Sequence, residues 1–292
     1  MSKLIGINLA MQTPMDAHGS INYARWEELI DLYIEAGVHG LVLGSGTGQH
    51  PYLTQQECNR LYEIGARRIN GRCKLICQTS ALVLDEVMER SRHAQGLGAD
   101  ALMILPPYLE GPEDDDGLFA FYETIDAAVE IDIIGYNIPQ VTGIDISVDL
   151  FKRLNQLEHF NYIKDSAGDL IRQQEYLATG YPVLNGCDPI TVFSFIAGAQ
   201  GCIWGGANYM PHESVRLFEL VASKDVAGAM KLWSRMIPSL LYIWRGNYVP
   251  KVKAASRLRG FDGGGVRAPL QNLSVDEEHE LAAYLEPLGL RG

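Results

Sequence analysis

Short runs of apolar residues alternate with longer amphipathic segments along the whole chain. The short runs predict eight β-strands, at Leu4–Ala10, Gly40–Leu43, Lys74–Gln78, Ala101–Leu105, Asp132–Tyr136, Asn161–Lys164, Pro182–Leu184 and Gly201–Trp204. Strands that alternate with helices are typical of a parallel α/β sheet. Eight such units favour a closed (β/α)8 TIM barrel over an open, doubly wound sheet.

Local signals mark where several helices begin. Thr54 with Glu57, and Ser274 with Glu277, have the spacing of capping boxes. Asp188 followed by Pro189 is typical of an N-cap with proline at the first helical position. The chain between residues 211 and 260 is also helical in pattern, and it is longer than an eighth barrel helix requires. We therefore expect a barrel core in residues 1–210, and the last barrel helix plus a C-terminal helical extension in residues 211–292, within a single domain.

Composition and charge narrow the class of protein. The chain has 292 residues, of which 47% are hydrophobic and 21% charged, and this favours a globular fold with a substantial core. A formal net charge of -12 argues against nucleic acid or an anionic membrane as a partner. The five cysteines form no CxxC pair, and the histidines form no HExxH motif, so we expect neither a disulfide framework nor a metal site. Without a membrane-spanning run or a signal peptide, we expect a cytoplasmic protein.

Lys164 is the most informative residue, because it ends a short apolar strand, Asn161–Lys164, and precedes a polar turn. Burial disfavours the ammonium form of a lysine, and a neutral amine is a nucleophile that forms Schiff bases with ketones. Taken alone, such a lysine more often extends its ammonium group to solvent. The residues at the other strand ends favour the interpretation of Lys164 as a nucleophile.

A glycine-rich segment, Gly44–Gly48, follows the second predicted strand. Its backbone N–H groups could converge on a carboxylate or phosphate, with Thr47 adding a hydroxyl. A dinucleotide fingerprint is disfavoured because the spacing is GxGxG, and a plain glycine-rich turn is the remaining alternative. Tyr136, at the end of the fifth predicted strand, could place a phenol beside the amine. Hydrogen-bonded to a hydroxyl such as Thr47, that phenol could shuttle protons during Schiff-base chemistry; the alternative is a tyrosine of the core.

Six segments together resemble the dihydrodipicolinate synthase and N-acetylneuraminate lyase family of lysine-dependent pyruvate aldolases and dehydratases. The resemblance extends from about Leu4 to about Leu288. It rests on Thr13–Pro14 with Asp16–Ile21, Gly46–Gly48 with Leu53–Glu57, Tyr136–Pro139 with Thr142–Gly143, Ile163–Asp169, Asn185–Asp188, and Gly198–Gly201 with Ala207–Asn208.

The resemblance implies a role for each of several residues. It implies that Lys164 forms the Schiff base, that Tyr136 transfers protons, and that Gly46 and Thr47 hold the carboxylate of the substrate. It also implies that Gly186 and the backbone near Ile203 line the pocket. No metal or organic cofactor is expected, because the iminium supplies the electrophile. Family members are commonly tetrameric, which implies a homo-oligomer, either a tetramer or a dimer.

Four positions depart from the synthase members of the family. Val141 stands where they have an arginine for a second carboxylate, and Gly46 where they have a threonine. Leu109 stands where they have a second tyrosine, although neighbouring Tyr108 would fill that role if the alignment moved by one residue. Gln49 replaces a glutamate. These departures argue against synthase activity.

The reaction predicted from these observations is that of a Schiff-base lyase. The expected substrate is a pyruvate-derived 2-oxo acid, with a 2-keto-3-deoxy sugar acid as the leading candidate. Dehydration of the 5-dehydro-4-deoxyglucarate type is the alternative reaction. A non-catalytic 2-oxo acid binding protein is the alternative of another class. A barrel enzyme for phosphorylated substrates is disfavoured because no lysine or arginine lies near Gly205 and Gly206.

Overall fold

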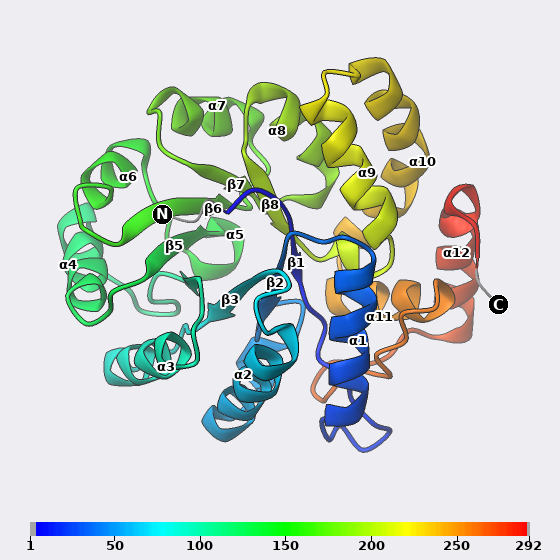
Figure 1. Ribbon diagram of the computed structural model, residues 1–292, viewed down its shortest axis with the longest axis horizontal. Helices are drawn as coiled ribbons and strands as arrows, with labels where there is room; N and C mark the ends of the chain where they lie inside the picture. Colours follow the sequence, from blue (N-terminus) through cyan, green and yellow to red (C-terminus); the bar gives the residue numbers. More distant parts are fainter. Residues whose placement is uncertain (1–3, 291–292) are drawn as a thin grey trace.

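The computed structural model describes residues 4–290, and within them eight parallel strands pair in sequence order to form a barrel (Figure 1). Strand β8 closes the barrel by pairing with β1. The strands are β1 Gly6–Ala10, β2 Gly40–Leu43, β3 Lys74–Gln78, β4 Ala101–Ile104, β5 Asp132–Asn137, β6 Phe160–Asp165, β7 Val183–Asn185 and β8 Gly201–Trp204. The predicted (β/α)8 barrel is therefore confirmed, and the strand bounds differ from the predicted ones by at most two residues.

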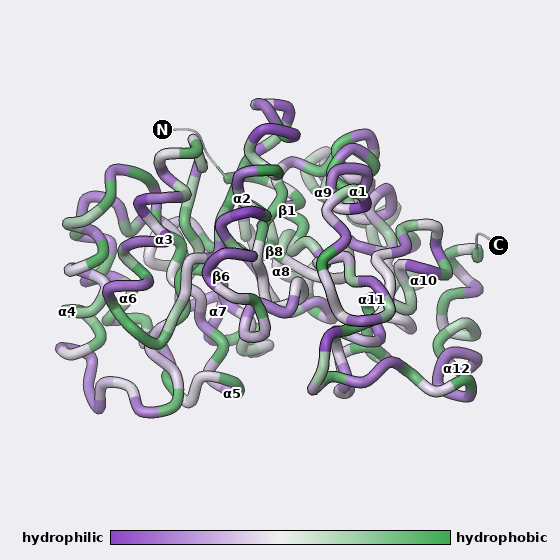
Figure 2. Tube along the Cα trace, turned by 90° about the horizontal axis from the view of Figure 1, so that it is seen from below, coloured by the Kyte–Doolittle hydropathy of each residue, from purple (hydrophilic) through white to green (hydrophobic). Residues whose placement is uncertain are grey.

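The longer helices that connect successive strands surround the barrel, because they pack their apolar faces back onto the sheet. Hydrophilic and hydrophobic stretches alternate along outer helices such as α2, as amphipathic helices require (Figure 2). The α-helices are α1 Tyr23–Glu35, α2 Gln55–Ile69, α3 Leu84–Gly96, α4 Asp115–Asp126, α5 Pro139–Thr142, α6 Val148–Leu154, α7 Leu170–Ala178, α8 Thr191–Ala197, α9 Pro211–Ala222, α10 Val226–Trp244, α11 Tyr248–Leu258 and α12 Val275–Leu285. Short 3-10 helices are η1 His50–Tyr52, η2 Asp188–Ile190, η3 Gly206–Asn208 and η4 Glu286–Leu288.

Two of the three predicted helix starts are confirmed. Thr54 and Ser274 each accept the backbone N–H of a glutamate three residues later, which completes the capping boxes of α2 and α12. The prediction for Asp188 is wrong, because Asp188 is the first residue of η2 and its side chain caps no helix. Its carboxylate instead accepts hydrogen bonds from Tyr248 and from the backbone of Gly206.

The inside of the barrel is filled by every second residue of the strands, since successive side chains point to opposite faces of a sheet. Its fully apolar part includes Val42, Ile76, Met103, Leu184 and Ile203. The same two-residue period places the next inward residue of each strand at the open, C-terminal end. That end of the barrel is where the predicted chemistry is concentrated.

Helices α10, α11 and α12 follow the barrel and lie together beside α1 and α9 (Figure 1). Helix α10 packs against α9 and α12, while α11 packs against α12 and η3, which directly follows β8. These contacts bring the first turn of α11 to the C-terminal end of the barrel. No helix among residues 4–290 is both long enough and apolar enough to cross a membrane.

Candidate active site

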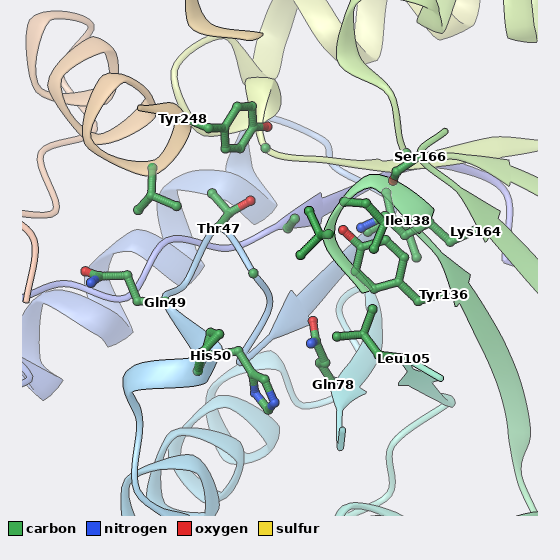
Figure 3. Close-up of a pocket in the computed structure, with 18 of the residues that line it drawn as sticks. Thr47, Gln49, His50, Gln78, Leu105, Tyr136, Ile138, Lys164, Ser166 and Tyr248 are labelled. Carbon is green, nitrogen blue, oxygen red and sulfur yellow. The ribbon is translucent and has the colours of Figure 1, made fainter. Parts of the chain in front are cut away.

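A cavity of about 540 Å³ opens at the C-terminal end of the strands. Enzymes of this fold place their active sites at this end. The cavity is lined by all six residues predicted from the sequence, which come from five different strand ends: Gly46, Thr47, Tyr136, Lys164, Gly186 and Ile203. Figure 3 shows several of these side chains directed into one space.

Lys164 and Tyr136 meet at the base of this cavity. They are partners in the register of β6 and β5, so their side chains point inward side by side. Lys164 is 5% exposed, and its Nζ lies 3.6 Å from the centroid of the Tyr136 ring. Within residues 4–290, this Nζ makes no hydrogen bond to another protein group. The amine is therefore held against a phenol ring while remaining available to a substrate.

Polar residues on the outer face of the sheet support these two strand ends. Asn137 donates to the carboxylates of Asp165, at 3.0 Å, and Asp145, at 2.9 Å. Arg172 in turn donates to Asp145 at 2.7 Å. Burial raises the pKa of Asp165 to about 6, although the Asn137 hydrogen bond opposes this effect. Because Asn137 follows Tyr136 and Asp165 follows Lys164, the network fixes the backbone on which both inward side chains are mounted.

The turn after β2 has the geometry of an anion site. Gly44 has a positive φ of 62°, and a Cβ there would lie 2.8 Å from the Tyr62 hydroxyl, so this position requires glycine. A Cβ at Gly46 would meet nothing within 4 Å, because Gly46 faces the open cavity. In the described part of the chain, no acceptor pairs with the backbone N–H of Gly46 or Thr47. Two unpaired N–H groups at a cavity wall can bind a carboxylate.

The Thr47 hydroxyl does not form the expected hydrogen bond with Tyr136 among the described residues. It lies instead beside Gly205, where an added Cβ would be 2.8 Å from Thr47 Oγ1 and 2.3 Å from the hydroxyl oxygen of Tyr248. Thr47 and Tyr248, which comes from α11, thus both lie beside Gly205. Figure 3 shows Tyr248 and Tyr136 on different sides of Thr47.

Gly186 and Ile203 form the wall next to the lysine. A Cβ at Gly186 would lie 2.6 Å from Lys164 Cε and 2.1 Å from Ser166 Oγ, so only glycine leaves room for the lysine side chain. Ile203 points inward from β8 and is fully buried.

The four positions that depart from the synthase pattern lie in different environments. Val141 is 71% exposed at the rim of the cavity. Leu109 is 84% exposed, and Tyr108 rather than Leu109 lines the cavity. The side chain of Gln49 exchanges two hydrogen bonds of 3.1 Å with the backbone of Arg267, so it holds the C-terminal segment in place. Gly46 lies in the turn after β2 and faces the cavity.

Sequence reasoning missed several residues of the cavity wall. Gln78, Ser166 and Tyr248 line the cavity, as do Trp244 and Leu270 from the C-terminal segment. Gln78 and Ser166 are the next inward positions on β3 and after β6, so the two-residue period could have identified them. Tyr248 lies in a helix far along the chain, and no local pattern marks it.

Comparison with known proteins decides the family. The model of the Dihydrodipicolinate synthetase family matches residues 3–288. The chain belongs to this family. The family's members are lyases that act through a lysine Schiff base, so this chain is such an enzyme, and the family resemblance predicted from the motifs is confirmed.

Curated relatives in the family match over nearly their full length. The chain is 31% identical over 290 residues to a 4-hydroxy-tetrahydrodipicolinate synthase of Methanopyrus kandleri, covering 98% of this chain and 96% of the relative. It is 30% identical over 288 residues to the synthase of the same name from Phenylobacterium zucineum, covering 98% and 97%.

Solved structures of the family have the same fold. The chain aligns with a TM-score of 0.94 and 28% identity to the chloride-inhibited dihydrodipicolinate synthase of Acinetobacter baumannii complexed with pyruvate, covering 99% of this chain and all of that one. The dihydrodipicolinate synthase of Aquifex aeolicus aligns with a TM-score of 0.92 and 28% identity, covering 98% of each chain.

Proposed function

We propose that the chain cleaves or forms the carbon–carbon bond next to the pyruvate unit of a 2-keto-3-deoxy sugar acid, with Lys164 as the Schiff-base residue. The observation that carries the proposal is the position of the Lys164 amine. It is unpaired in residues 4–290, lies against the Tyr136 ring, and shares one cavity with the free N–H groups of Gly46 and Thr47. A 2-oxo acid presents a carboxylate and a ketone on adjacent carbons, which matches this pairing of an anion turn with an amine.

The reaction follows from the roles of these groups. The substrate carboxylate binds the Gly46–Thr47 turn, and the Lys164 amine attacks C2 to give a carbinolamine. Tyr136, whose ring contacts the amine, moves the protons that allow water to leave. The resulting iminium accepts the electrons of the C3–C4 bond as that bond breaks, while the C4 hydroxyl loses its proton and C4 leaves as the carbonyl carbon of an aldehyde. Protonation of the enamine and hydrolysis of the imine then release pyruvate and free Lys164.

Two features of the cavity support a polyhydroxylated substrate. The volume of about 540 Å³ is much larger than pyruvate alone requires. Ser166 Oγ and Gln78 Oε1 are buried and have no hydrogen-bond partner in the described chain. Buried polar groups are nearly always paired, and both residues line the cavity, so these side chains favour a polar ligand there.

The synthase reaction for which the relatives are named is less well supported. The product 4-hydroxy-tetrahydrodipicolinate carries two carboxylates. Lys164 is the single lysine or arginine among the described residues that line the cavity, and exposed Val141 occupies the position of the synthase arginine. A second carboxylate would therefore find no cationic side chain.

The proposal is tested by turnover of a panel of 2-keto-3-deoxy sugar acids that differ in chain length and in configuration at C4. We expect release of pyruvate from at least one of them, and no release by Lys164→Ala. Loss of water without pyruvate would indicate the alternative dehydration of the 5-dehydro-4-deoxyglucarate type. Formation of 4-hydroxy-tetrahydrodipicolinate, with no turnover of any sugar acid, would contradict the proposed substrate class.

The oligomeric state is a separate part of the proposal. We expect a homo-oligomer, either a tetramer or a dimer, because members of the family commonly assemble in this way. Analytical ultracentrifugation of the purified chain distinguishes these states from a monomer.

A further inference from the structure

Besides Tyr136, the phenol of Tyr248 lines the cavity, from the first turn of α11 (Figure 3). Its hydroxyl donates a 2.7 Å hydrogen bond to Oδ2 of Asp188, which lies sixty residues earlier in the chain. This contact joins the C-terminal helices to the loop after β7. It also makes Tyr248 the one cavity-lining hydroxyl in residues 4–290 that is hydrogen-bonded to a carboxylate.

Asp188 is 1% exposed and incompletely paired. Its Oδ2 accepts from Tyr248 and from the Gly206 backbone at 3.0 Å, while Oδ1 has no partner within the described residues. Lys164, Tyr209 and the thiols of Cys187 and Cys202 are the other titratable groups around it. Burial raises the pKa of Asp188 to about 6, so near neutral pH it is a carboxylate that can accept a proton.

Because residue 205 is a glycine, the hydroxyl groups of Tyr248 and Thr47 can both pack against its backbone at the cavity wall. A Cβ at Gly205 would lie 2.3 Å from that oxygen and 2.8 Å from Thr47 Oγ1. Gly205, Thr47 and Tyr248 all line the cavity, and they lie next to the Gly46–Thr47 turn. A substrate anchored at the Gly46–Thr47 turn can therefore reach Tyr248.

Cleavage of the C3–C4 bond requires that the hydroxyl on C4 lose its proton. The cavity is lined by His50 and by four phenols, those of Tyr52, Tyr108, Tyr136 and Tyr248, of which only Tyr248 is hydrogen-bonded to a carboxylate among the described residues. Tyr136 lies against the Lys164 amine and serves imine formation in the proposed reaction. His50 hydrogen-bonds the Ser80 carbonyl through Nε2, and burial lowers its pKa to about 4, so it is a weak base. Tyr248, by contrast, is connected to a carboxylate.

We propose that Tyr248 and Asp188 form a second proton relay, which accepts the proton of the substrate's C4 hydroxyl during cleavage and returns it during condensation. The inference rests on the proposed function. Tyr248 is assigned as a catalytic residue that contacts the substrate, and Asp188 as the residue that positions Tyr248 and receives its proton.

The relay step balances without any further reactant. The O–H bond on C4 breaks as its proton passes to the Tyr248 oxygen, while the Tyr248 proton passes to Asp188 Oδ2. The electrons of the O–H bond form the C4 carbonyl. The electrons of the C3–C4 bond form the C2–C3 double bond of the enamine, and the iminium nitrogen becomes neutral.

The test separates imine chemistry from bond cleavage, using Tyr248→Phe and Asp188→Asn. Trapping of pyruvate on Lys164 with borohydride reports the imine, and exchange of pyruvate methyl protons in deuterium oxide reports the enamine. Neither needs a C4 hydroxyl. Cleavage is measured with the 2-keto-3-deoxy sugar acid that the unmodified enzyme turns over fastest. Tyr242→Phe is the matched control, because Tyr242 also donates to a carboxylate, Glu280 at 3.0 Å, but does not line the cavity.

We expect Tyr248→Phe to retain trapping and exchange while its kcat for cleavage falls by about 10²-fold or more. Asp188→Asn should lower kcat and remove the rise of kcat with pH near 6, a change that a structural role would not produce. Tyr242→Phe should behave as the unmodified enzyme does.

Unchanged kcat in Tyr248→Phe, or parallel loss of exchange and cleavage, would overturn the relay while leaving the lysine chemistry in place. If the unmodified enzyme formed no Lys164 adduct with any 2-oxo acid, the proposed function itself would fail, and the relay with it. Thermal unfolding of each variant shows whether the protein remains folded.

Discussion

Lys164 and Tyr136 are register partners on adjacent strands, and the lysine Nζ lies 3.6 Å from the centroid of the tyrosine ring. This contact places the proposed nucleophile next to the phenol that we propose transfers its protons. The ring of Tyr136 makes this contact, whereas its hydroxyl is the group proposed to transfer protons. The two parts of the side chain can therefore be tested individually.

Replacing Tyr136 by phenylalanine keeps the ring beside the lysine and removes only the hydroxyl. We expect the rate of imine formation with pyruvate to fall by about 10²-fold or more, because proton transfer to the departing oxygen is lost. The melting temperature should change little. The rate of imine formation is measured by adding borohydride to samples at timed intervals and quantifying the trapped adduct. Tyr162→Phe is the control, because Tyr162 is an inward tyrosine of β6 that lies outside the cavity lining; equal slowing in both variants would contradict a specific role for Tyr136.

Adding a methyl group at Gly186 should displace the lysine. A Cβ there would lie 2.1 Å from Ser166 Oγ and 2.6 Å from Lys164 Cε. We expect Gly186→Ala to lose about 1–3 kcal/mol of unfolding free energy through overpacking, and to lose more than about tenfold in activity through misplacement of the amine. Gly96→Ala, where a Cβ meets nothing within 4 Å, is the control. Urea unfolding and steady-state kinetics report the two effects, and full activity in Gly186→Ala would count against the assigned position of Lys164.

Arg267 fastens the C-terminal segment to the mouth of the barrel. It donates to both carboxylate oxygens of Glu57, at 2.7 and 2.8 Å, and to the carbonyls of Gly19 and Tyr52. Leu270, three residues later, lines the cavity. We expect Arg267→Ala to lower the unfolding free energy by roughly 1–3 kcal/mol and to raise KM more than it lowers kcat.

The control for this prediction is Arg67→Ala. Arg67 pairs with Glu27 at 2.7 Å on the exposed side of α2, so its removal should change stability by less than about 1 kcal/mol. Equal effects of the two substitutions would show that the Arg267 contacts do not fasten the segment.

His50 should make the protein less stable in mild acid. Burial lowers the pKa of its imidazole from 6.5 to about 4, so between these values the unfolded chain binds a proton that the folded chain does not. Stability is therefore lost as pH falls below 6.5, by about 2 kcal/mol at pH 5. The raised pKa values of Asp165 and Asp188 act in the opposite direction, but they are shared by the variants compared and cancel in the difference.

Urea unfolding of the unmodified protein and of His50→Gln at pH 7 and pH 5 measures this effect. Lowering the pH from 7 to 5 should reduce the unfolding free energy of the unmodified protein more than that of His50→Gln. His18→Gln, at an exposed position, should show no such shift. The same pH dependence in all three proteins would contradict the assignment to His50.

Features that depend on neighbouring residues could be predicted from the sequence. The apolar runs predicted all eight strands, because burial on both faces leaves little room for polar residues. The capping boxes at Thr54 and Ser274 were correct, because each is completed by a residue three positions away. The six candidate site residues lie in one cavity because the ends of parallel barrel strands meet there.

Contacts between distant segments were not predictable in this way. Asp188 has the local pattern of an N-cap, but Tyr248 of α11 takes its carboxylate. Thr47 was expected to bond Tyr136, yet its hydroxyl lies beside Gly205 and Tyr248. Both differences arise from the packing of α11 against η3, the short helix after β8, which no single stretch of sequence encodes.

The central claim is that Lys164 forms a Schiff base with a 2-oxo acid. It is tested most directly by borohydride trapping with pyruvate, followed by intact-mass and peptide mass spectrometry. The account predicts a reduced pyruvyl adduct on the peptide that contains Lys164 and no adduct in Lys164→Ala. An unmodified Lys164, with pyruvate and with the longer 2-keto-3-deoxy sugar acids alike, would contradict it.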